Sequence, residues 1–137
     1  MKVKIETIVA LAEILAGLKV SRIPGPDSRR TLLEDYATLR RVVKTAEADK
    51  AELVSKFQAD WADEIPAVES FRREGKPVAG HAEYLEAEKD ANKAIQALFS
   101  QEVEVCLNPV KLSALDGIQD LTLNQSALLM ENGIVEL

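Results

Sequence analysis

The residues best suited to chemistry are arginines around a turn of proline and glycine, in the sequence SRIPGPDSRR at residues 21–30. Arg29 and Arg30 come directly after this turn, at the predicted start of a long helix. Positive charge there opposes the helix dipole, whereas guanidinium groups beside free backbone N–H groups suit a phosphate or a carboxylate. Arg22 precedes the turn and is close enough in sequence to join them. The pattern therefore indicates an anion-binding turn.

Two further arginines, Arg40 and Arg41, lie about three turns along the same predicted helix, roughly 15 Å away. They would contribute to the same anion site from another subunit of an assembly. A second interpretation remains open, in which all five arginines pair with acids or lie across the apolar face of the helix. The nearby acids are Asp27, Glu34 and Asp35.

Other patterns of catalytic or metal-binding residues are missing from the sequence. The chain has one histidine, His81, and one cysteine, Cys106, so it offers no pair of strong metal ligands at a useful spacing. No nucleophile motif, phosphate-binding loop or dinucleotide fingerprint occurs. We therefore predict a protein without a metal or a cofactor that is not an enzyme, with His81 in a loop or capping role and Cys106 packed as a small hydrophobic residue.

Composition and charge exclude some kinds of partner. The 137 residues carry a net charge of −6, whereas a protein that binds nucleic acid or a membrane surface needs a basic face. No apolar run approaches the roughly 20 residues of a membrane span. A single cysteine fits a reducing compartment. These observations predict one domain over residues 1–137, located in the cytoplasm.

Apolar periodicity predicts an N-terminal helix within residues 1–20 and a long helical hairpin over residues 27–101. Asp27 or Ser28 caps the first arm of the hairpin. That arm, at residues 28–63, would be roughly 50 Å long and needs a partner helix from this chain or from another copy. Its apolar residues alternate by fours and threes, as in helices packed along a seam. The seam residues are Leu32, Tyr36, Leu39, Val43, Ala46, Lys50, Leu53 and Phe57.

Lys50 interrupts this seam. It either sets the register of a homo-oligomer or marks the place where the helix leaves its partner. The second arm of the hairpin is predicted at residues 82–101, after a loop that contains Gly75, Pro77 and Gly80.

Residues 102–137 are predicted to form a strand and a capped C-terminal helix. Val103, Val105 and Leu107 alternate with more polar positions, which is typical of a strand. Its partner is the N-terminal KVKIE, the following VKLSAL, or another subunit. Thr122 and Gln125 have the spacing of a capping box, and Asn132 with Gly133 ends the helix. The expected fold class is mainly α, a long antiparallel helical hairpin with a short β element and a small C-terminal helix.

The layout resembles a class of small phage and prophage helical-hairpin accessory proteins of unknown function. The matching segments are MKVKIETI, LLEDYATLRRVVKTAEADKAELVSKF, EVEVCLNPVKLSAL and LTLNQSALLMENGIVEL. The resemblance covers most of the chain and implies an accessory protein of a phage or mobile element. It brings no catalytic residues with it.

Two functional hypotheses follow. In the first, a homo-oligomer sequesters a small anionic ligand, such as a nucleotide signal of host immunity, through Arg22, Arg29, Arg30, Arg40 and Arg41. In the second, the protein is a structural or assembly adaptor, or a chaperone-like factor, that binds another phage or host protein through its helical seam. A further alternative is an inhibitor that binds one host protein through its acidic faces.

Overall fold

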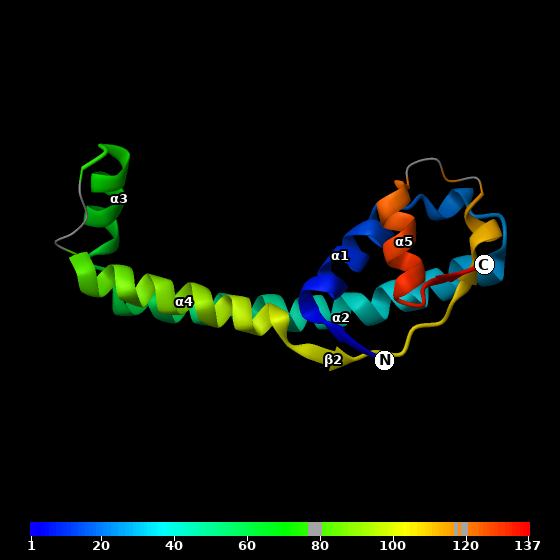
Figure 1. Ribbon diagram of the computed structural model, residues 1–137, viewed down its shortest axis with the longest axis horizontal. Helices are drawn as coiled ribbons and strands as arrows, with labels where there is room; N and C mark the ends of the chain where they lie inside the picture. Colours follow the sequence, from blue (N-terminus) through cyan, green and yellow to red (C-terminus); the bar gives the residue numbers. More distant parts are fainter. Residues whose placement is uncertain (77–80, 117, 119–120) are drawn as a thin grey trace. The chain divides into compact units, whose positions relative to one another are not determined.

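The computed structural model describes residues 1–76, 81–116, 118 and 121–137. Its backbone packs as two compact units, one formed by residues 1–45 with 100–137 and the other by residues 46–99. Helix α2, Pro26–Asp60, contributes residues to both (Figure 1). One domain over residues 1–137 stays a prediction, and the internal packing is concentrated in these two units.

The first unit opens with strand β1, Lys2–Lys4, which leads directly into helix α1, Ile5–Ala16. Strand β1 pairs antiparallel with strand β2, Glu102–Glu104, so that Val3 lies opposite Val103. Of the candidate partners, the N-terminal segment is therefore confirmed for this strand. Alternating valines make the pairing favourable because they place one face of the small sheet against the core.

A second, parallel sheet was not predicted. Strand β3, Val110–Lys111, pairs with strand β4, Val135–Glu136, near the C-terminus. The alternative partner for β2, the segment VKLSAL, instead pairs with β4 through Val110 and Lys111 and continues as a short 3-10 helix, Leu112–Leu115. Two-residue strands are too short to show alternation in a sequence.

The C-terminal helix α5, Leu123–Glu131, has the predicted capping box. The backbone N–H of Gln125 donates to Thr122 Oγ1 at 3.1 Å, and the backbone N–H of Thr122 donates to Gln125 Oε1 at 2.9 Å. The helix ends at Asn132 as predicted. Its apolar residues do not all face inward: Leu129 is completely buried, whereas Leu123, at the first helical position, is 87% exposed.

Helix α2 begins earlier than expected, at Pro26. Proline suits the first helical position because its missing N–H has no partner there in any case. Asp27 and Ser28 therefore lie within the first turn, and the prediction that one of them caps the helix was wrong. The core of the first unit collects apolar residues from its helices and both sheets. Its buried members include Val3, Ile8, Leu11, Leu15, Ile23, Leu32, Leu39, Val105, Leu115, Leu129 and Ile134.

The second unit contains the end of α2, helix α3, Ile65–Arg73, and helix α4, Ala82–Ser100. Tyr84 is 3% exposed, and its ring lies 5.5 Å from that of Phe57 and 5.7 Å from that of Trp61. These aromatic contacts hold α4 against the end of α2 as the predicted antiparallel hairpin. Of the predicted loop, Pro77 and Gly80 lie outside the described residues.

The predicted seam is covered by the chain's own side chains. Leu32 and Leu39 are buried in the core of the first unit, with Tyr36 and Val43 packed against it. In the second unit Ala46 is buried, and Leu53 and Phe57 are half-buried. Lys50 is exposed, so it does not interrupt a packed face within this chain. A role of the seam between copies stays a prediction.

Candidate functional site

The positive charge of the protein is concentrated in one part of the first unit. Residues 19–44 contain seven basic and three acidic residues, a net charge of +4, whereas the rest of the chain contains ten basic and twenty acidic residues. The overall charge of −6 hides this contrast. This segment adds Lys19 and Lys44 to the five predicted arginines.

The predicted arginines lie on two elements of this segment. Arg22 ends a 3-10 helix, Val20–Arg22, and the other four belong to α2. Arg29 is half-buried, and the others are exposed. We call these five residues the basic row; they are Arg22, Arg29, Arg30, Arg40 and Arg41.

Within the described residues, no arginine of the basic row forms an ion pair with an acid. The alternative in which they pair with Asp27, Glu34 or Asp35 therefore finds no support in these contacts. Arg41 makes one weak bond inside its own helix, where its Nε donates to the carbonyl of Ala37 at 3.4 Å.

Helix geometry arranges part of the row as a line. Arg29, Leu33, Tyr36 and Arg40 are spaced by four, three and four residues, so they share one face of α2. The eleven residues from Arg29 to Arg40 correspond to about 16 Å along the axis. Within one chain, the arginines are therefore too widely spaced to surround a single small anion.

An apolar pocket of about 180 Å³ lies on this face, between α2, the end of α1 and the turn that joins them. It has no acidic residue in its lining. The lining residues are Leu15, Ala16, Leu18, Ile23, Leu32, Leu33 and Tyr36. Leu33 lines the pocket and is 52% exposed. Sequence reasoning named Leu32 and Tyr36 only as seam residues and missed the pocket.

Among the described residues of the first unit, Asp35 is the buried charged residue, at 1% exposed. Its Oδ1 accepts the backbone N–H of Asn108 at 2.9 Å, while its Oδ2 has no hydrogen-bond partner among the described residues. Burial raises the pKa of this carboxyl to about 6, although the bond from Asn108 acts in the opposite direction and Glu34 adds to the rise. Asp35 therefore binds the segment between β2 and β3 through Asn108. The loss of hydration of its buried carboxylate opposes this interaction.

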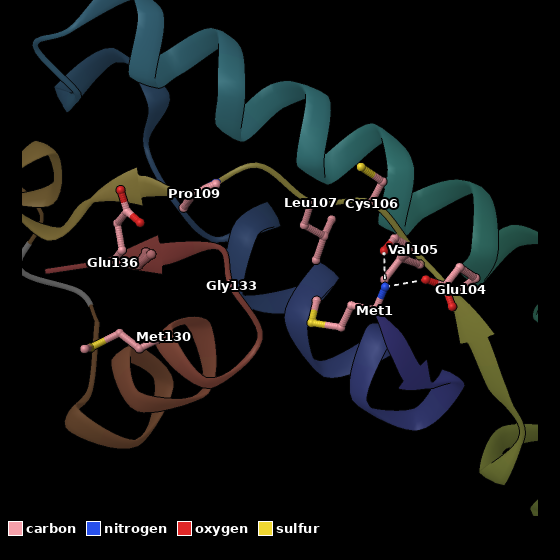
Figure 2. A pocket seen from close by; sticks show the side chains of 10 residues that line it. Met1, Glu104, Val105, Cys106, Leu107, Pro109, Met130, Gly133 and Glu136 are labelled. Atoms are coloured by element: carbon pink, nitrogen blue, oxygen red, sulfur yellow. Dashed lines mark hydrogen bonds and ion pairs between the residues drawn. The ribbon is translucent and has the colours of Figure 1, made fainter.

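A larger groove of about 640 Å³ lies between the end of β2 and strand β4. Figure 2 shows Glu104 and Val105 at one end of it, Met130 and Glu136 at the other, and Met1 and Leu107 between them. Its charged groups already have partners. The Met1 ammonium contacts Glu104 and donates to the Val105 carbonyl at 3.3 Å (Figure 2), and Glu136 pairs with Lys111 at 3.0 Å.

Cys106 lines this groove and is exposed. The prediction that it packs as a small hydrophobic residue was wrong: just after β2, Val105 is buried and Cys106 beside it is exposed. His81 lies 5.6 Å from the ring of Phe71 and 3.5 Å from Glu64 Oε2, which is a packing role at the start of α4.

In the described part of the chain, no group of three or more His, Cys, Asp and Glu side chains is placed to hold a metal ion. Nor does any described helix combine the length and apolar character needed to cross a membrane.

The polar cluster of the second unit is built on Arg72 and Glu88. The guanidinium donates to both carboxylate oxygens, at 2.8 and 3.1 Å, and the Tyr84 hydroxyl approaches the same carboxylate at 3.4 Å. The bonds from Arg72 hold the pKa of Glu88 below its usual value, whereas burial raises the pKa of Tyr84. The cluster joins α3 to α4, and each charge in it already has its partner.

Comparisons with protein-family models, with curated proteins and with solved structures found no match. The resemblance to phage accessory proteins therefore stays a prediction. The local arrangement of the basic row is the remaining basis for a functional conclusion.

Proposed function

We propose that this is a non-enzymatic binding protein whose basic row holds an acidic segment of a partner protein. The observation that supports this is a line of arginines without acidic partners among the described residues, in a chain with six more acidic than basic residues. Guanidinium groups form strong, bidentate hydrogen bonds with carboxylates. A partner that supplies these carboxylates gains both affinity and orientation.

The spacing of the row favours an extended partner. An extended peptide rises about 3.3 Å per residue, so the roughly 16 Å between Arg29 and Arg40 corresponds to about five residues. A segment with acidic residues at that separation reaches both arginines at once. This proposal belongs to the adaptor class that the sequence suggested. A phage setting would supply the partner as another phage protein or a host protein.

A small phosphate-bearing ligand, sequestered by the protein, is the second candidate. The observation that favours it is that Arg29 and Arg30 are neighbours about one turn after the start of α2 at Pro26. The N–H groups of Asp27 and Ser28 precede the first i→i−4 bond of the helix, which runs from Arg29 to the Gly25 carbonyl at 3.0 Å. Arg40 and Arg41 of the same chain do not reach such a ligand together with this pair, because they lie about three turns further along the helix. Sequestration with all five arginines needs a second copy.

Fluorescence anisotropy separates the two candidates. The two probes are labelled ATP and a short labelled peptide. The peptide carries two glutamates on each side of a central serine, with about five residues between the two pairs. We expect the peptide to bind more weakly as salt rises, because its contacts are ionic. Reversal of both charges in Arg40→Glu/Arg41→Glu should weaken peptide binding at least tenfold, since each reversal replaces an attraction by a repulsion.

The matched control is Lys89→Glu/Lys93→Glu. These lysines are exposed on α4 in the second unit. Their replacement by glutamate changes the net charge by the same amount as Arg40→Glu/Arg41→Glu. Equal weakening by both double variants contradicts a specific site and indicates general charge attraction. Binding of ATP that depends on Arg29 and Arg30 but not on Arg40 and Arg41 instead supports the second candidate.

A further inference from the structure

We infer that the apolar pocket beside the basic row receives one bulky apolar side chain of the acidic partner segment. This inference rests on the proposed function and adds to it the sequence signature of the partner. The pocket is the one lined by Leu33, Tyr36 and their neighbours on α1 and the turn. The partner then carries an acid, an apolar anchor and a second acid, in that order.

The lining of the pocket determines what it accepts. Its seven residues are aliphatic apart from Tyr36, and a volume of about 180 Å³ has room for one leucine or phenylalanine side chain. An isolated charged group is excluded, because it would lose its hydration without gaining an ionic partner. An aliphatic or aromatic side chain fits the site both in size and in polarity.

The position of the pocket along α2 links it to the arginines. Arg29 lies four residues before Leu33, and Arg40 lies four residues after Tyr36, so each arginine is about 6 Å along the axis from the pocket. All four residues share one face of the helix. A partner segment crossing this face therefore meets a positive charge, an apolar recess and a second positive charge.

Leu33 supports an interface at this place. It is 52% exposed in the chain alone, and an apolar anchor seated beside it removes that surface from water. An anchor in an apolar pocket with charged residues around it is the arrangement in which interfaces concentrate their binding energy. The charge of the surrounding arginines selects an acidic segment over a neutral or basic one.

The test compares two labelled peptides that differ at one residue. Each peptide has two glutamates on each side of its central residue. This residue is leucine in one peptide and serine in the other. With the unmodified protein, we expect the leucine peptide to bind about ten times more tightly, as burial of roughly one leucine side chain implies. Anisotropy titrations in the same buffer give both affinities.

Two variants test the pocket itself without altering charge. Leu33→Asn makes its rim polar at an exposed position, and Ala16→Phe fills it from the exposed end of α1. Each should remove the preference for leucine while the serine peptide binds as before. Leu123→Asn, at an exposed leucine of α5, is the control and should keep the preference. Circular dichroism establishes that each variant is folded.

The outcomes separate this inference from the proposed function. Equal binding of the two peptides, or a leucine preference that survives both pocket variants, overturns the anchor and leaves the basic row as the site. If neither peptide binds at low salt, both proposals fail. A tenfold preference that disappears in Leu33→Asn and Ala16→Phe but not in Leu123→Asn supports the anchor.

Discussion

Replacement of Asp35 by asparagine should stabilise the first unit at neutral pH and have a smaller effect in acid. The side chain is buried, one carboxylate oxygen lacks a partner among the described residues, and burial raises the pKa from its ordinary value of 3.8 to about 6. The folded state therefore holds the proton more tightly than the unfolded state does. The ionised form destabilises the protein above about pH 6, and this destabilisation disappears as the pH falls through 6 toward 4.

The size of the effect follows from the same shift. About two pKa units at roughly 1.4 kcal/mol each give about 3 kcal/mol between the two ends of this pH range. The difference in unfolding free energy between Asp35→Asn and the unmodified protein should therefore be larger by about that amount at pH 8 than at pH 4. Any change in the unfolding free energy that the asparagine amide itself causes is the same at every pH and cancels when pH 8 is compared with pH 4.

Urea unfolding followed by circular dichroism measures this difference, since urea does not screen charges. Trp61 is the single tryptophan and lies in the second unit, so its fluorescence follows that unit separately. Glu13→Gln is the control, because Glu13 is an exposed carboxylate on α1 in the same unit as Asp35. Its stability difference from the unmodified protein should stay within about 0.5 kcal/mol across the pH range. If Asp35→Asn changes stability equally at pH 4 and pH 8, the buried carboxyl does not ionise as argued.

Three further predictions concern packing and assembly. Leu129→Ala should destabilise the first unit by about 2–5 kcal/mol, because it leaves a cavity, whereas Leu123→Ala at an exposed site should change it by less than about 0.5 kcal/mol; urea unfolding distinguishes them. Thr122→Ala should cost about 1 kcal/mol in the same assay through loss of the capping box, and no change would contradict that cap. Native mass spectrometry should show a homo-oligomer, and a change of mass in Lys50→Glu would support a role of that residue in register.

Helices α1, α2 and α4 and the cap of α5 could be predicted from the sequence because their signals are local, although α2 begins at Pro26 and not at the predicted cap. Periodic apolar residues indicated α1, α2 and α4, and Thr122 with Gln125 three residues later indicated the cap of α5. The alternation Val103, Val105 indicated β2, and a short matching segment at the N-terminus was among its possible partners. Each of these signals, apart from the choice of partner for β2, depends on residues within about one or two turns of each other. The position of the arginines at the start of α2 is local in the same way.

Burial, in contrast, was decided by segments far apart in the chain. Asp35 looked like a surface acid in a helix, and it is buried because Asn108, 73 residues later, meets it. Cys106 was predicted to pack as a small hydrophobic residue, and it is exposed. The apolar pocket exists only because α1 and the turn pack against Leu33 and its neighbours. The sequence by itself determined which residues could bind an anion, and the tertiary structure decided that an apolar recess lies among them, since a recess forms only where separate elements pack together.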